Sequence, residues 1–303
     1  MRVTQSMISN NMLSNLSNSY SKLDQYNNQL SSGKKISRPS DDPVIAMKGI
    51  YYRSDVTQVE QYQRNLSEAT NWVDSSDDAL DKVTSALQRI RELTVQGATD
   101  TNSIESRQAA ADEIKQLIDH IGTIGNTMVG DKYIFNGVDT TTKPVNITTQ
   151  QDPLNPKQIV IQGSSYTDNS SFNVEVSKGV KIGVNVDPAN IFDTGTFNTL
   201  ATVYNNIVNG NSNSINQSLG DVDKIITNVL TARTKIGATQ NRMDMINDRL
   251  GSQEVIANRI MSDNEDADIE KVITNLKTQE SVHNAALGVG ARIIQPTLLD
   301  FLR

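Results

Sequence analysis

The sequence predicts a mainly α-helical protein with a β insert, built as an elongated, discontinuous helical rod with paired terminal helices and a small β domain. Three observations lead to this. Apolar residues recur in steps of three and four at both ends of the chain. The same spacing fills most of the sequence between them, and one β-type stretch interrupts it. Hydrophobic residues make up 36% of the chain and aromatic residues 5%, which favours thin layers over one thick core.

The N-terminal segment, residues 3–31, is predicted to be a long polar helix. Its apolar seam, which includes Tyr20, is diluted by Asn27, so we expect it to need a partner helix. The seam residues that we expect to pack are Leu13, Leu16, Leu23 and Leu30.

The C-terminal segment, residues 267–292, shows the same three-four spacing. Polar and small residues again interrupt the seam, among them Gln279, His283 and Gly290. We expect this helix to pair with the first one as a coiled coil. Its packing residues would be Ile269, Val272, Leu276 and Ile293.

Turn-forming residues end the first helix at Gly33 and continue to Pro43 (SGKKISRPSDDP). Asp42 before Pro43 is typical of an N-cap followed by a first-turn proline. A second helix is predicted from about Val44 to Gln96. A third follows, with the stripe Ala110, Ile114, Leu117, Ile121, Ile124 and Met128.

The pattern then changes to short β-type runs. Residues 133–135 meet Asn136-Gly137, which predicts a hairpin turn. Further runs cover 159–161, 172–176 and 180–186, and helical spacing returns from Leu200 onward. We therefore predict a terminal coiled-coil domain (1–42 and 262–303), a helical rod domain (43–134 and 198–261) and an inserted β domain (135–197).

Composition excludes several classes of function. A formal net charge of -7 argues against binding to nucleic acid, because phosphate contacts need a basic surface. The absence of cysteine excludes disulfides and thiolate chemistry. No apolar run approaches the length of a membrane helix or a signal peptide, so we expect no membrane insertion and, for a protein working outside the cell, a route other than cleaved-signal export.

The sequence offers no catalytic constellation, and we expect no cofactor and no metal. His120 and His283 lie in different predicted helices. The acidic clusters at 74–81 and 263–268 lack the glycine and glutamate of a calcium loop, and we interpret them as solvated helix starts. The one Gly-x-Gly, at 288–290, lies inside a predicted helix rather than after a strand.

Four ordered blocks resemble bacterial flagellins and their relatives. They are the segment LSSGKKI at 30–36 leading to DDP at 41–43, LQRIRELTVQ at 87–96, ADIE at 267–270 and LLDFLR at 298–303. The segment GDKYIFNG at 130–137 is similar to the hook-associated branch of this family.

The resemblance implies a structural subunit, without enzymatic activity, that forms a junction layer between flagellar hook and filament. It implies unfolded export through the flagellar type III channel, an extracellular location, and ends that order only in the assembly. The implied partners are other copies of the chain, an adjoining hook-associated protein, flagellin or a second junction protein, and a cytosolic export chaperone. The chaperone would dock at Leu298, Leu299, Phe301 and Leu302, which could equally pack inside the assembled tube.

The resemblance also singles out Arg89, Leu93 and Glu113, which match positions that flagellins present to an immune receptor. In a junction subunit we expect them to contact neighbouring subunits instead. Two alternatives to the junction role stay open. One is a divergent flagellin that forms the filament itself, and the other is a secreted coiled-coil binding module.

Overall fold

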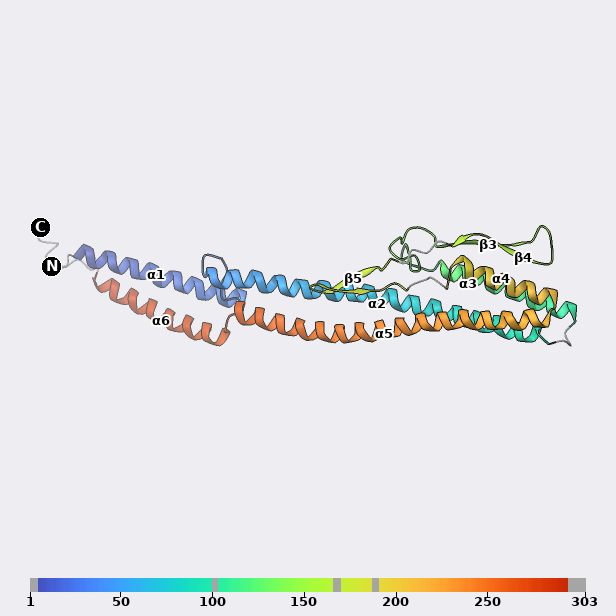
Figure 1. Cartoon of the computed structure of the whole chain (residues 1–303). Helices are drawn as coiled ribbons and strands as arrows, with labels where there is room; N and C mark the ends of the chain where they lie inside the picture. The colour runs from blue at the N-terminus through green and yellow to red at the C-terminus, as the bar shows by residue number, and fades with distance from the viewer. Residues whose placement is uncertain (1–4, 100–102, 166–169, 187–190, 294–303) are drawn as a thin grey trace, which may run out of the picture. The chain divides into compact units, whose positions relative to one another are not determined.

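The computed structural model describes residues 5–99, 103–165, 170–186 and 191–293, without the side chains of 5–6, 164–165 and 292–293. Within these residues it contains six α-helices and three two-stranded antiparallel sheets (Figure 1). The predicted fold class, mainly α with a β insert, is confirmed. None of the described helices is long and apolar enough to cross a membrane.

The chain divides into two compact units. Unit 1 joins the two ends of the chain, Met1–Gln58 and Ser252–Arg303, and unit 2 is the continuous stretch Val59–Gly251. The three-domain division made from the sequence stays a prediction.

Unit 1 holds α1 (Gln5–Ser32), α6 (Ile269–Ile293), the start of α2 (Pro43–Gly97) and the end of α5 (Ser212–Glu265). Helix α1 ends because Gly33 takes a positive φ of 68° and donates its N–H to the carbonyl of Gln29 at 2.9 Å. Helix α2 begins at the predicted cap, where the Asp42 carboxylate accepts from the backbone N–H of Val44 at 2.9 Å.

Unit 2 contains the continuous hydrophobic core. It holds the rest of α2 and α5, together with α3 (Ile104–Gly125) and α4 (Thr194–Asn209), which pack against each other. The largest fully buried side chains come from the helices and from the chain around the β insert: Phe135, Phe192, Phe197, Leu80, Leu87, Ile90, Ile114, Ile118, Ile121, Ile134, Ile159 and Ile182.

Polar side chains link α2 to α5 inside unit 2. The Arg233 guanidinium contacts the carboxylates of Asp77 at 3.0 Å and Asp81 at 2.7 Å. Gln240 donates to Asp74 at 2.8 Å. The acidic cluster at 74–81 is therefore bonded across helices, which corrects its interpretation as a merely solvated helix start.

The first hairpin of the insert differs from the prediction. Strand β1 (Met128–Val129) pairs with β2 (Lys132–Tyr133), so the turn lies at Gly130-Asp131, where Gly130 has a φ of 60°. Asn136-Gly137 forms a turn that joins no two strands. Met128, expected in the third helix, lies in β1 and is exposed because α3 already ends at Gly125.

The remaining strands form two more hairpins. Strand β3 (Val145–Gln151), which the sequence did not predict, pairs along its whole length with β4 (Ile159–Ser165), and this hairpin packs on α3 and α4 (Figure 1). Strand β5 (Asn173–Ser177) pairs with β6 (Val180–Gly183). Gly163 is required in β4, because a Cβ there would lie 2.1 Å from the carbonyl oxygen of Asn146.

Candidate assembly surface

Unit 1 is poor in buried apolar side chains. Among its described residues only Val56, Ala257 and Val272 are buried hydrophobics, and none belongs to the continuous core cluster of unit 2. Since apolar burial is the main favourable term in folding, this unit has little to hold it together by itself.

The contact between α1 and α6 also contains polar residues. Ser19 is buried in it, and its hydroxyl accepts from the Gln279 amide at 2.9 Å and lies 3.3 Å from Nδ1 of His283. The ring of Tyr20 lies 6.1 Å from that of His283, centroid to centroid. Polar groups inside a seam specify register at a cost in stability.

The seam of α1 lies one residue from the predicted line at alternate positions. Met12 and Tyr26 are half-buried and Ser19 is buried, whereas Leu13, Tyr20 and Asn27 are exposed. Leu16, Leu23 and Leu30 are half-buried, as is Leu276, whereas Ile269 is exposed. Ile293 ends α6, and its side chain is not described.

Gly290 shows how closely the two helices approach. It is buried, and a Cβ built on it would lie 2.1 Å from the Met12 methyl carbon. Beside this contact Leu13, Leu16 and Leu287 line a small apolar hollow. Gly290 therefore allows Met12 to approach α6 closely, and the apolar side chains beside them remain open to solvent.

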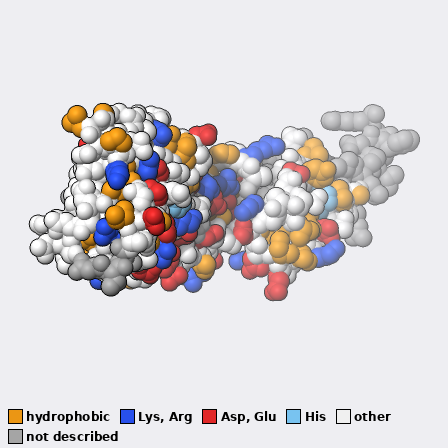
Figure 2. All heavy atoms as spheres, turned by 90° about the vertical axis from the view of Figure 1, so that its right-hand side faces the viewer, with side chains coloured by type: hydrophobic (Ala, Val, Ile, Leu, Met, Phe, Trp, Pro, Cys, Tyr) orange, Lys and Arg blue, Asp and Glu red, His pale blue; other side chains and the backbone are white. Residues whose placement is uncertain are grey.

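Exposed large hydrophobic residues gather on unit 1. Unit 2, although larger, has few and scattered ones, and the face drawn in Figure 2 shows acidic and basic side chains interspersed with small apolar patches. Exposed apolar surface of this extent marks an interaction site. Its members are Met7, Ile8, Leu13, Tyr20, Val44, Met47, Ile50, Tyr51, Val255, Ile256, Ile260, Ile269, Ile273, Val282, Leu287 and Val289.

A short backbone joint ties the two ends of the chain together in unit 1. Lys35 donates its N–H to the carbonyl of Glu265 at 2.7 Å, and Ala267 donates to the carbonyl of Gly33 at 2.8 Å. Lys34 and Asp266 thus form an isolated antiparallel bridge. The segment that follows α1 is held against the break between α5 and α6.

Glu265 supplies the buried charge of this joint. The residue is only 4% exposed, and its two carboxylate oxygens are each 2.7 Å from nitrogens of the Arg53 guanidinium. The Lys34 ammonium lies 3.5 Å from the same carboxylate and 2.6 Å from that of Asp266. The prediction of a solvated acidic helix start at 263–268 is therefore wrong for Glu265, because two cations neutralise it inside the joint.

The charges of the joint shift one another's titration. The hydrogen bond from Lys34 holds the pKa of Asp266 below its ordinary value, and the same bond raises the pKa of Lys34. Glu265 likewise raises the pKa of Arg53. Each of these shifts favours the charged form of Lys34, Arg53 or Asp266.

The loop between the joint and α2 is ordered by Asp41. Its carboxylate accepts from the backbone N–H groups of Ser37 at 3.0 Å and Arg38 at 2.9 Å, and these bonds lower its pKa. The paired Asp41-Asp42 of the sequence signature thus has two structural uses, one in folding the loop and one in capping α2.

The predicted subunit-contact residues lie in unit 2 and differ in accessibility. Arg89 binds Glu113 at 2.7 Å and Glu92 at 3.0 Å on the surface. Leu93 is only 3% exposed and belongs to the core cluster. Its expected role as a contact therefore needs correction, because its side chain is enclosed by its own unit.

Leu298, Leu299, Phe301 and Leu302 lie outside the described residues. Within those residues no group of three or more His, Asp or Glu side chains could hold a metal ion.

Comparison with known proteins places the chain in a family. The model of the bacterial flagellin N-terminal helical region matches residues 3–140, and that of the C-terminal helical region matches residues 219–302. The chain belongs to the flagellin family, and it is therefore a flagellar structural protein rather than an enzyme.

Individual relatives come from both branches of the family. The flagellar hook-associated protein 3 of Salmonella typhimurium is 26% identical over 94% of this chain and 95% of its own length. The flagellin of Bacillus subtilis is 29% identical over 80% of each chain. A solved structure from Vibrio parahaemolyticus, described as a flagellar hook-associated protein, has 22% identity and a TM-score of 0.65, and covers 75% of this chain and 100% of its own. That likeness confirms the fold.

Proposed function

We propose that this chain forms the layer that joins the flagellar hook to the filament. The hook-associated relative aligns with nearly the whole chain, whereas the Bacillus subtilis flagellin aligns with less of it. A junction subunit needs few copies and two different neighbours, and it performs no chemistry.

The observation that carries this proposal is the contrast between the two units. Unit 2 has a continuous core, but the terminal unit has little apolar burial and an extensive exposed apolar surface. In a protein that stayed monomeric, such an apolar surface would remain exposed to water, which is unfavourable. A subunit would cover it with its neighbours and gain order from them.

The same proposal includes the route and the partners. The chain would leave the cell unfolded through the flagellar type III channel and work outside it. Its partners would be other copies of itself, an adjoining hook-associated protein, and flagellin or a second junction protein. A cytosolic chaperone would hold residues 298–302 before export.

Deletion of the gene tests the proposal, with electron microscopy of the cells and an assay of flagellin in the medium. We expect hooks without filaments and flagellin released into the medium, because filament subunits would be exported but not retained. A plasmid copy of the gene should restore filaments.

Two other outcomes would contradict the junction role. If flagellin disappeared from both cells and medium, this chain would be the filament subunit itself. If the flagella were normal, the chain would serve another purpose, such as a secreted binding module.

A further inference from the structure

Helices α1 and α6 meet along one seam whose residues are spaced three and four apart. On α1 the seam consists of Met12, Leu16, Ser19, Leu23, Tyr26 and Leu30, all buried or half-buried. On α6 it consists of Val272, Leu276, Gln279, His283, Ala286 and Gly290, which are also buried or half-buried. Since a helix turns by about 100° per residue, the residues just after the seam positions lie on one side of this antiparallel helix pair, and the residues just before them lie on the other side.

The residues that follow the seam positions make one side of the pair apolar. Leu13 and Tyr20 of α1 are 56% and 68% exposed, and Leu287 of α6 is 46% exposed. Leu13 lines a hollow of about 250 Å³ together with Leu287 and Ala291, so the positions that follow the seam on both helices lie on the same side. We call this the groove side.

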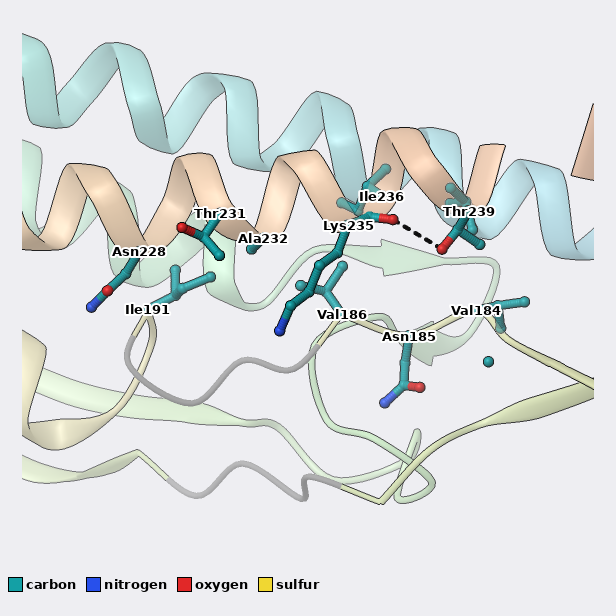
Figure 3. Close-up of a pocket in the computed structure, with 12 residues that line it drawn as sticks. Val184, Asn185, Val186, Ile191, Asn228, Thr231, Ala232, Lys235, Ile236 and Thr239 are labelled. Atoms are coloured by element: carbon teal, nitrogen blue, oxygen red, sulfur yellow. Dashed lines mark hydrogen bonds between the residues drawn. The ribbon is translucent and has the colours of Figure 1, made fainter. Parts of the chain in front are cut away.

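The hollow on the groove side is open, unlike the hollow on unit 2 beside α5 (Figure 3). In the unit 2 hollow each apolar wall residue is at most 7% exposed. These residues are Val184, Val186, Ile191, Ala232 and Ile236. Exposed apolar surface for an incoming side chain is therefore found on the groove side of unit 1.

The residues that precede the seam positions form the opposite side, which we call the ridge side. On α1 they are amides and one lysine, whereas on α6 Val282 and Val289 are 52% and 55% exposed. The two valines stand seven residues apart, the repeat at which side chains of one helix enter holes of a neighbour. They cannot enter the groove side of their own chain, because the two sides face away from each other across the same seam.

Charge divides between the two sides as well. The only charged side chains that the structure describes on α1 are Asp24, on the groove side, and Lys22, on the ridge side. On α6 Glu280 lies on the groove side, where Lys277 pairs with it at 3.1 Å, and Lys271 lies on the ridge side. The groove side therefore carries both acids and one paired base, and the ridge side carries bases alone.

The two sides match in their positions along the helices. Val289 adjoins Gly290, which is one of the residues that line the hollow, so Val289 lies level with the hollow. Lys22 and Asp24 are two residues apart, or about 3 Å along the axis of α1. A parallel copy placed alongside with little axial shift would therefore bring its Val289 to the hollow and its Lys22 to Asp24.

We propose that the ridge side of one subunit packs into the groove side of a second, parallel copy of the chain, with Val289 in the hollow and Lys22 facing Asp24. The occupant is a second copy because α1 and α6 themselves carry both the complementary shape and the complementary charge. The two surfaces differ, so the contact is heterologous, and contacts of that kind generate rings or helical layers. The proposal rests on the junction function, since it names how neighbouring copies meet in the layer.

Cysteine cross-linking tests the contact, because the chain has no cysteine. Two full-length variants with different tags, Tyr20→Cys on the groove side and Val282→Cys on the ridge side, would be expressed together in cells lacking the natural gene. After a short bis-maleimide reagent is applied to isolated flagella, we expect a mixed dimer that carries both tags. The matched control replaces Val282→Cys with Ser281→Cys, an exposed neighbour on α6 that is turned away from the seam.

The outcomes separate this contact from the junction function. Immunoblots of the isolated flagella first establish that both chains are assembled. A mixed dimer that is absent from the control supports the contact. No mixed dimer from assembled chains overturns it and leaves the junction function standing, because the groove would then hold another occupant, such as residues 294–303 of the same chain. Dimers of two Tyr20→Cys chains also overturn it, because groove would face groove.

Charge reversal tests the same contact without cysteines and does not require Tyr20→Cys to assemble. Lys22→Asp or Asp24→Lys alone brings like charges together between copies, and we expect several-fold fewer filaments per cell by electron microscopy. The double variant restores opposite charges and should recover the filaments. Residues two apart on a helix do not face each other, so this recovery would come from the contact between copies. Unaffected single variants, or a double variant no better than either single one, would overturn the contact.

Discussion

At the scale of the residue, Glu265 shows how a buried charge can connect distant parts of the sequence. It accepts from Arg53 of α2 and faces Lys34 of the loop after α1, and its own backbone carbonyl accepts from Lys35. Gly49 makes room for this carboxylate, since a Cβ there would lie 2.6 Å from Oε1. One acidic residue therefore contacts both of the other segments that meet at the joint.

Glu265→Gln should weaken the joint by roughly 1–2 kcal/mol, because it removes the charge from bonds that charged partners strengthen. The loss stays moderate since the Arg53 and Lys34 side chains are partly exposed. We expect fewer filaments per cell by electron microscopy and more flagellin in the medium. Asp263→Asn is the control, since its exposed carboxylate is outside this cluster. Equal filament numbers in both variants would show that the charge is dispensable.

At the scale of the element, the sequence predicted the helices well and the β insert incompletely. Long three-four stripes located α1, α2 and α6 to within a few residues. Strand β3 was missed because VNITTQQ is polar and shows little alternation, and its pairing depends on the distant β4. The hairpin turn was predicted at Asn136-Gly137 because this dipeptide is common in such turns. The turn lies at Gly130-Asp131 instead, because its position is set by which strands pair and not by the local dipeptide.

The seam of α1 shows a second limit of sequence reasoning. Leucine spacing identified Leu16, Leu23 and Leu30, but the buried Ser19 carries no hydrophobic signal. Its position follows from hydrogen bonds to Gln279 and His283, 260 residues or more away. Such a partner cannot be recognised from local spacing.

The terminal helices carry a prediction about assembly. Leu23→Asp or Leu276→Asp should abolish filament attachment while leaving the thermal unfolding of the purified chain within about 2 °C, because the core of unit 2 contains neither residue. Asn27→Asp is the control: the sequence placed Asn27 on the seam, but the structure leaves it exposed. Normal filaments in the leucine variants would contradict the seam.

Two glycines test the packing of unit 2. A Cβ at Gly125 would lie 2.7 Å from Val145 and 2.9 Å from Phe192, whereas nothing lies within 4 Å of one at Gly237, in the middle of α5. Gly125→Ala should cost about 1–3 kcal/mol through overpacking. Gly237→Ala should gain about 0.5–1 kcal/mol. Thermal unfolding followed by circular dichroism should show shifts of opposite sign, and a stabilising Gly125→Ala would mean that α3 is more loosely packed than described.

At the scale of the whole molecule, stability and assembly belong to different parts of the sequence. The middle of the chain folds around its own core, and the joined ends expose apolar residues that a solitary protein would bury. The family assigns such a chain to the flagellum, and the uneven distribution of apolar surface explains how it can be both a stable unit and an assembling one.

Chemical labelling compares the surface before and after assembly. Met47→Cys places a thiol on the exposed apolar surface of unit 1, where Met47 is 71% exposed, and Lys178→Cys places one on the exposed turn between β5 and β6 of unit 2. Each variant would be treated with a maleimide as the purified chain and as isolated flagella. We predict that both label in the purified chain, and that in flagella Met47→Cys is protected while Lys178→Cys still reacts. Equal labelling of Met47→Cys in the two states would contradict the claim that the terminal unit is the assembly surface.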